Sequence, residues 1–382
     1  MRFPSKFIGL LVILLCSCRA AGPAGNFGQT LSQESLNSLL SPAQGQYYHF
    51  DRYVQRMLHV DAVAETLQVS DALGASFKES YWVPSETGAY AFLIEGRNVR
   101  IKNQIDEPAR DVLRLGDDLV SYAVAPTDGV YAWIDTNLSI ALLQLDDQGQ
   151  TLGQWTGGPL LPSGQRFAAG EMLSGGRMLL SLDSHELILV DCLASIQAKA
   201  WVFSKLSFAN QTVKWVGRIS SQPDRVLLWT NTGYLLYDVK TQTTVATIAL
   251  TESQVGLFSS KLGQPHLGFQ DLSKGTLSLV YPEGDKLMTV SLPETLGEPV
   301  ASFFNGTTLL VQTAQHKVLK IRVSDALVAA TLSFKSEARL GLGEDKVVAV
   351  YDSPLGYITI QRFDSDEVTV LKGFNRPYVQ RP

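Results

Sequence analysis

The feature that most constrains this chain is a strand–turn–strand unit that recurs along most of its length. Its clearest copy is Asp224–Leu250, in which three apolar runs rich in Val, Leu, Ile, Trp and Tyr are separated by two polar turns. Apolar runs with little polar alternation are typical of strands that are covered on both faces. Turns containing Asn, Asp and Gly are typical of tight connections between antiparallel strands. The unit therefore predicts an antiparallel meander of three strands.

Copies of this unit follow one another at a nearly constant spacing. A polar residue marks the first turn of each copy, and successive marks lie 39 to 48 residues apart. A period in the low forties with several strands per repeat is typical of one blade of a β-propeller. The first-turn positions are Asp51, Glu95, Asp135, Asp183, Asn231, Asp271, Thr313 and Asp352, and the second-turn positions are Asp61, Asp106, Asp147, Asp191, Asp238, Asp285, Asp325 and Asp364.

Eight copies predict an all-β fold, an eight-bladed β-propeller with four-stranded antiparallel blades. The first copy lacks an innermost strand upstream, so we expect Pro377–Gln380 to pair into blade one and close the ring. The flanking prolines count against that pairing, because proline is poorly accommodated inside a sheet. A seven-bladed ring with an irregular N-terminal addition and an irregular sandwich with chance spacing are the alternatives. The innermost strands of other blades are expected at Lys78–Val83, Leu119–Val124, Val213–Ile219, Val255–Ser260 and Ser302–Asn305.

Residues 1–17 have the pattern of an export signal. Arg2 and Lys6 are basic, and the apolar run Phe7–Leu15 behind them is too short to span a bilayer as a helix. The segment Leu15–Cys18 resembles the bacterial lipobox, a resemblance that implies Cys18 as the lipid-bearing residue. An ordinary cleaved signal with incidental cysteines is the alternative.

The remaining chain divides into a tether and one domain. Residues 18–45 are rich in Ala, Gly, Ser, Gln and Asn, so we expect an acylated cysteine followed by a flexible tether. Residues 46–382 show no break in composition and are expected to form a single propeller domain. In bacterial lipoproteins, Asp after the acylated cysteine usually signals retention at the inner membrane. The residue here is Arg19, which implies the outer membrane, with the domain facing the periplasm.

The net charge limits the expected classes of partner, and the cysteine content indicates a core residue. Removing Arg2 and Lys6 with the signal changes the formal net charge from −5 to −7. An acidic chain without basic clusters predicts that neither nucleic acid nor anionic lipid headgroups are its partners. Cys192 is the single cysteine of the expected domain, and its apolar setting predicts a small core residue at the end of a strand.

The sequence offers no clear catalytic or metal-binding pattern. The turn acids appear once per hairpin, without the clustering that builds a calcium site, and turn formation explains them. We therefore predict no catalytic residue, no metal and no cofactor. The histidines, which show no zinc-site spacing, are His49, His59, His185, His266 and His316.

The tryptophans divide into expected core residues and one candidate anchor. Trp133 and Trp229 occupy the same position in their blades and are expected between blades, and Trp82 and Trp215 lie on innermost strands. Trp155 ends a strand before a connection rich in Gly and Pro. Because tryptophan is frequent among the residues that dominate protein interfaces, we predict Trp155 as the partner-binding residue.

The repeat resembles the propeller superfamily of WD-type, YVTN-type and quinoprotein-like repeats, and Tyr237–Thr243 is close to their shared strand–turn–strand text. An eight-bladed propeller on an outer-membrane lipoprotein resembles BamB, the accessory lipoprotein of the barrel-assembly machinery. That resemblance implies a non-enzymatic, monomeric scaffold that binds another envelope or outer-membrane protein. The Gly-plus-Trp text of quinoprotein repeats is absent from most units, so quinone binding is not implied. The alternative is a ligand binder or lactonase-like hydrolase that uses the central channel.

Overall fold

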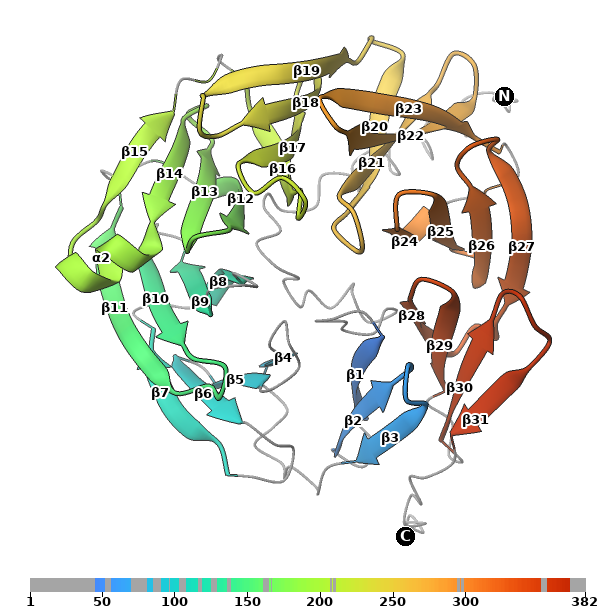
Figure 1. Cartoon of the computed structure of the whole chain (residues 1–382), viewed down its shortest axis with the longest axis horizontal. Coiled ribbons are helices and arrows are strands. Elements are labelled where there is room, and N and C mark those ends of the chain that lie inside the picture. The colour runs from blue at the N-terminus through green and yellow to red at the C-terminus, as the bar shows by residue number, and fades with distance from the viewer. Residues whose placement is uncertain are drawn as a thin grey trace, which may run out of the picture.

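The computed structural model of the chain is a ring of antiparallel β-sheets around a central axis (Figure 1). The described residues form eight sheets, seven with four strands and one with three. In every sheet neighbouring strands are consecutive in the chain, so each sheet is a simple meander. This confirms the predicted all-β, eight-bladed β-propeller rather than the seven-bladed ring or the sandwich. The structure describes residues 45–51, 56–69, 81–84, 91–95, 97–102, 108–115, 119–124, 129–135, 139–160, 165, 167–206, 208, 211–293, 296, 299–351 and 356–371.

The blades are numbered one to eight along the chain. The first four contain β1 (Gln46–Asp51), β2 (Arg56–Asp61), β3 (Thr66–Val69); β4 (Tyr81–Pro84), β5 (Ala91–Glu95), β6 (Asn98–Lys102), β7 (Arg110–Arg114); β8 (Leu119–Val124), β9 (Val130–Asp135), β10 (Ser139–Leu145), β11 (Thr151–Pro159); and β12 (Phe167–Leu173), β13 (Arg177–Leu182), β14 (Leu187–Asp191), α2 (Cys192–Ala198), β15 (Phe203–Leu206). The last four contain β16 (Val213–Arg218), β17 (Arg225–Thr230), β18 (Gly233–Asp238), β19 (Thr243–Ala249); β20 (Gln254–Ser260), β21 (His266–Asp271), β22 (Thr276–Glu283), β23 (Lys286–Leu292); β24 (Pro299–Phe304), β25 (Thr308–Thr313), β26 (Lys317–Arg322), β27 (Leu327–Ser333); and β28 (Ala338–Leu342), β29 (Lys346–Tyr351), β30 (Tyr357–Arg362), β31 (Val368–Leu371).

Blade one differs from the others because its described part has only three strands. Its first strand, β1, ends at Asp51, which holds the first-turn position of the repeat, so β1 corresponds to the second strand of the other blades. The prediction of four strands per blade is therefore not met in the described part of blade one. Pro377–Gln380, expected to supply the missing strand, lies outside the described residues, and this closing strand stays a prediction.

The innermost strands lie close to their predicted positions. β8 covers the predicted residues Leu119–Val124 in full. β24 begins at Pro299, three residues before the predicted start at Ser302. Proline is tolerated there because it occupies the first position of a strand, where a β-bulge interrupts the pairing.

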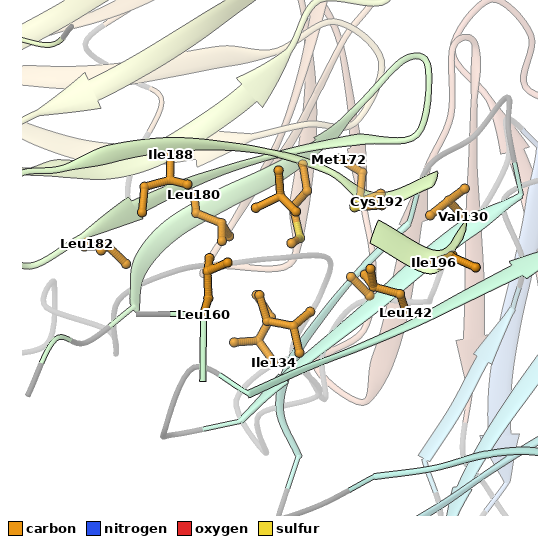
Figure 2. Close-up of a cluster of buried hydrophobic side chains, with 14 residues drawn as sticks. Val130, Ile134, Leu142, Leu160, Met172, Leu180, Leu182, Ile188, Cys192 and Ile196 are labelled. Atoms are coloured by element: carbon orange, nitrogen blue, oxygen red, sulfur yellow. The ribbon is translucent and has the colours of Figure 1, made fainter. Parts of the chain in front are cut away.

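The core of the ring lies between the blades. In its described part, seven clusters of buried apolar side chains each join two neighbouring blades. Figure 2 shows one of them, in which Ile134 and Leu142 of blade three face Met172, Leu180 and Ile188 of blade four. In the described part, blades three to eight are thus covered on both faces, which explains why their strands are apolar without alternation.

Two of the predicted core tryptophans are fully buried in these clusters. Trp133 is 2% exposed and packs edge-to-face on Phe92 of blade two, with ring centroids 5.5 Å apart. Trp215 is 5% exposed at the junction of blades five and six. Trp229 packs against the same junction but is only half-buried. The environment of the Trp82 side chain lies outside the described part of the structure.

Blade eight packs directly against blade one, and this contact is the seam of the ring. Leu58 and Val60 of blade one share an apolar cluster with Val348 and Val350 of blade eight. Beside the cluster, the Glu65 carboxylate accepts hydrogen bonds from side chains of blade eight. The donors are the Arg362 guanidinium and the Thr369 hydroxyl, the latter at 3.0 Å, and Lys346 Nζ lies 4.0 Å away.

Candidate functional site

The structure locates one of the two residues that the sequence singles out. Cys18, the predicted lipid-bearing residue, and nearly all of the tether lie outside the described residues, so the anchor stays a prediction. Trp155 lies on β11, the outermost strand of blade three, and is half-buried. Its role as a partner-binding residue also stays a prediction, but its surroundings are well defined.

Trp155 packs against a second tryptophan that comes from blade four. The rings of Trp155 and Trp201 meet edge-to-face, with centroids 4.4 Å apart and planes at 64°. The Trp201 indole N–H donates a hydrogen bond of 3.1 Å to the carbonyl oxygen of Gly158. A Cβ atom at Gly157 would lie 2.3 Å from the Trp201 ring, so only glycine lets the indole rest on this strand. The pair is therefore held in one orientation.

Trp201 is positioned by α2, a short helix inserted between the last two strands of blade four. Asp191 caps its N-terminus, because the carboxylate accepts the backbone N–H of Ala194 at 2.9 Å. The helix ends at Lys199, which adopts a left-handed conformation with φ of 50° and turns the chain back toward the sheet. The helix lies at the rim of the ring beside β11 and β15 (Figure 1).

The buried side of α2 is joined firmly to the core. Ser195 is fully buried; its hydroxyl donates to the Asp191 carbonyl oxygen at 2.6 Å and accepts the backbone N–H of Val202 at 3.0 Å. Cys192 is also fully buried, and this burial raises the pKa of its thiol well above the usual range. A thiol that stays protonated is a poor nucleophile, so the prediction that Cys192 is a core residue is confirmed.

Exposed apolar residues lie close in the chain to both tryptophans. Leu152 of β11 is 62% exposed, and Val202 and Phe203, which follow Trp201, are each 39% exposed. We call these five residues, Leu152, Trp155, Trp201, Val202 and Phe203, the perimeter patch. Exposed apolar side chains gathered around half-buried aromatic rings are typical of protein interaction sites.

The outer edge of β11 is covered in part by side chains of blade four. The carbonyl oxygen of Gln154 accepts a hydrogen bond from Lys199 Nζ, and that of Gly158 accepts one from Trp201. An outermost strand normally leaves such groups open to pairing with a foreign strand. Because these acceptors are occupied, a partner would contact the perimeter patch through side chains rather than by strand addition.

Charged and polar side chains lie beside the patch on blade four. Glu186 pairs with Lys205 of β15, and its carboxylate accepts a 2.8 Å hydrogen bond from the Gln165 amide. The hydrogen bond from Lys205 holds the pKa of Glu186 below its usual range, so the carboxylate is charged at neutral pH. An apolar centre next to a charged, hydrogen-bonded margin is the usual composition of a protein interface.

One histidine is buried at a junction between blades. His266 of blade six is 0% exposed; its Nδ1 lies 2.8 Å from the carbonyl oxygen of Gln264 and its Nε2 lies 2.8 Å from Ser302 Oγ of blade seven. A carbonyl oxygen can only accept, so Nδ1 carries the proton and Nε2 accepts from the Ser302 hydroxyl. Burial lowers the pKa of His266 to about 4, and the ring stays neutral.

We expect His266 to make the fold sensitive to mild acid. The folded pKa of about 4 lies below the ordinary value of 6.5, so the unfolded chain binds a proton that the folded chain excludes. The contribution to stability is complete above pH ~6.5 and is lost as the pH falls toward ~4, by about 3 kcal/mol at most. Urea unfolding at pH 7 and 4.5 should show a smaller pH effect in His266→Gln than in the wild type. An unchanged pH effect in His266→Gln, or an equal reduction in the exposed His185→Asn control, would contradict this assignment.

The turn acids organise the hairpins, as predicted. Asp61 accepts the backbone N–H groups of Val63 and Ala64, both at 2.9 Å, and Asp238 accepts that of Thr241 at 2.8 Å. Asp106 and Asp352 lie outside the described residues. Within the described ranges, no three His, Cys, Asp or Glu side chains lie close enough together to hold a metal ion.

Two of the predicted turn positions are wrong in detail. In blade three the turn is made by Asp146 rather than Asp147, because Asp146 accepts the N–H groups of Gln148 at 3.0 Å and Gln150 at 2.7 Å. In blade four Asp191 caps α2 instead of closing a hairpin.

Comparisons with known proteins agree with the β-propeller fold. No family model matches the chain, and no curated protein matches it in sequence. In the described part of the chain, no helix has the length and apolar character needed to cross a membrane. Among solved structures, the dihydro-heme d1 dehydrogenase NirN in complex with DHE is similar with a TM-score of 0.58 at 14% identity, over 92% of this chain and 75% of that one. The WD40 domain of SCAP from fission yeast is similar with a TM-score of 0.52 at 13% identity, over 85% of this chain and 94% of that one. At such low identity these likenesses show the β-propeller fold alone.

Proposed function

We propose that this protein is a non-enzymatic scaffold that binds another protein of the bacterial cell envelope through the perimeter patch. The single observation that carries the proposal is the Trp155–Trp201 pair, held in one orientation among three exposed apolar side chains. Rigid aromatic side chains lose little conformational entropy on binding, which is why such residues dominate interfaces. A propeller suits this role because its rigid ring presents a fixed surface to a partner.

The proposed address is the periplasmic face of the outer membrane, with outer-membrane protein assembly as the process served. It rests on the lipobox-like segment ending at Cys18 and on Arg19 after it. In this proposal residues 18–45 serve as a tether, and a flexible chain of 28 residues would span roughly 30 Å. The ring would then be free to orient its rim toward a neighbouring membrane protein.

A photoreactive amino acid placed at Phe203 is expected to cross-link one reproducible protein partner in intact cells. The reason is that Phe203 is 39% exposed and lies two residues after Trp201, whose indole is bound to β11. In the same background, Trp201→Ala is expected to reduce the cross-linked product at least fivefold, because the indole anchor and its hydrogen bond to Gly158 are lost. Mass spectrometry of the cross-linked band identifies the partner.

The matched control is the same photoreactive residue at Leu327, which is 56% exposed on the outermost strand of blade seven. It should give no comparable product. Two outcomes would contradict binding at the perimeter patch. One is equal cross-linking from Phe203 and Leu327, and the other is a Phe203 product that is unchanged by Trp201→Ala. Circular dichroism of the purified variant would verify that Trp201→Ala leaves the ring folded.

A further inference from the structure

A β-bulge recurs at the start of several innermost strands. The pairing register shifts after the first residue of β8, β12, β16 and β24. A bulge leaves its extra residue out of the ladder and redirects that side chain. In β16 the extra residue is Lys214, and in β24 it is Val300.

Two of these residues belong to a set of four that hold the same position in their innermost strands. Lys214, Val255, Val300 and Arg339 are each the second residue of the innermost strand in blades five, six, seven and eight. In all four blades the first residue of that strand pairs with the last residue of the neighbouring strand. The equal register gives the four residues equivalent positions on strands that lie toward the inside of the ring (Figure 1), and β20 and β24 are in contact with each other.

Apolar side chains are unusually exposed on the innermost strands of blades six and seven. Val255 is 40% exposed and Val300 is 52% exposed, and Leu257, two residues further along β20, is 37% exposed. Most other apolar residues of the strands are buried between blades, so three exposed ones on two adjoining innermost strands form a distinct surface. We call Lys214, Val255, Leu257 and Val300 the channel patch.

The cation of the patch is tied to its apolar part through a tryptophan. Lys214 is exposed, and its Nζ lies 5.8 Å from the centroid of the Trp229 ring. The same ring packs on β20, where a Cβ atom at Gly256 would lie 2.0 Å from it. The ammonium group, the indole and the strand that bears Val255 and Leu257 are therefore neighbours.

The charges at these positions favour an anion. Two of the four second-position residues are charged, and both are cations: Lys214 and the half-buried Arg339. The chain as a whole has a net charge of −5. The exposed acids Glu252 and Glu337 lie in the turns that precede β20 and β28, outside the set of second positions. A ligand seated on the valines would thus meet the positive charge of Lys214.

We propose that the channel patch binds an anionic ligand with an apolar body, of the class of fatty or aromatic carboxylates. The carboxylate pairs with Lys214, and the apolar body covers Val255, Leu257 and Val300. The combination is typical of small-molecule sites, in which apolar walls supply contact area and a few polar groups fix orientation. This site is separate from the perimeter patch and does not depend on the scaffold function.

The test is calorimetric titration of 2-naphthoate into the full chain carried in lipid nanodiscs, with empty nanodiscs as the blank. The wild type should bind 2-naphthoate, and it should bind the neutral 2-naphthylmethanol at least fivefold more weakly. Lys214→Gln should weaken the binding of 2-naphthoate at least fivefold and leave the binding of 2-naphthylmethanol unchanged. Lys214→Arg, which keeps the positive charge, should bind 2-naphthoate like the wild type. Val300→Ser should weaken both ligands, because it removes shared apolar contact.

Two exposed residues away from the channel serve as controls. Lys240→Gln, in a turn of blade five, and Leu327→Ser, on the outermost strand of blade seven, should bind like the wild type. The proposal is overturned if the wild type binds no 2-naphthoate or if Lys214→Gln binds it with unchanged affinity. Equal losses in the control variants would overturn it as well, because the loss would then not be specific to the channel.

Discussion

Leu58→Ala is expected to lower the free energy of unfolding by about 2–5 kcal/mol, as is usual for removing a fully buried leucine. Leu58 is 0% exposed and packs in the seam cluster with Val348, Val350 and Ile358 of blade eight. The truncation leaves a cavity at the one junction where residues nearly 300 positions apart in the chain must meet. Urea unfolding followed by tryptophan fluorescence would measure the loss.

The control for this substitution is Leu327→Ala. Leu327 is 56% exposed on the rim of blade seven, so its truncation should change the unfolding free energy by less than ~0.5 kcal/mol. If Leu58→Ala were no more damaging than Leu327→Ala, blade one would not be packed against blade eight. The contact between blades one and eight that closes the ring would then be wrong.

Cys18→Ala is expected to abolish fatty acylation and move the protein from the membrane fraction to the soluble fraction. The proposed anchor rests on acyl chains, which contribute about 0.8 kcal/mol per buried methylene, so that several chains hold a soluble domain stably. Metabolic labelling with radioactive palmitate and fractionation of the envelope would read out both effects.

Cys16→Ala is the matched control, because Cys16 lies two residues before Cys18 in the same segment. It should retain the label and the membrane location. Labelling that persists in Cys18→Ala, or that is lost only in Cys16→Ala, would show that the lipobox resemblance has been placed on the wrong residue. Membrane association without any label would contradict the anchor itself.

The fold could be predicted from the repeat because the repeat reflects local chemistry. Asp61 and Asp238 bind the backbone of their own turns, so their spacing in the sequence reports the spacing of hairpins. Strands covered on both faces need continuous apolar runs, and those runs mark the blades. Cys192 could be predicted as a core residue for the same reason, since it directly follows such a run.

The candidate sites could be predicted only in part, because they depend on contacts between blades. The spacing of 48 residues between Asp183 and Asn231 leaves room for an insertion, but it does not reveal that α2 carries Trp201 onto Trp155. The bulges that expose Lys214 and Val300 arise from strand pairing, which no local pattern specifies. Glu65 was likewise missed, because its partners on blade eight lie about 300 residues away.

Closure of the ring between the first and last blades is tested most directly by zero-length carbodiimide cross-linking of the monomer. Glu65 Oε1 lies 4.0 Å from Lys346 Nζ, so a Glu65–Lys346 bond should appear in the peptide map. The Glu171–Lys261 ion pair, which joins blades four and six, provides an internal positive control. Recovery of both cross-links is the predicted result. Recovery of Glu171–Lys261 without Glu65–Lys346 would contradict the closed ring.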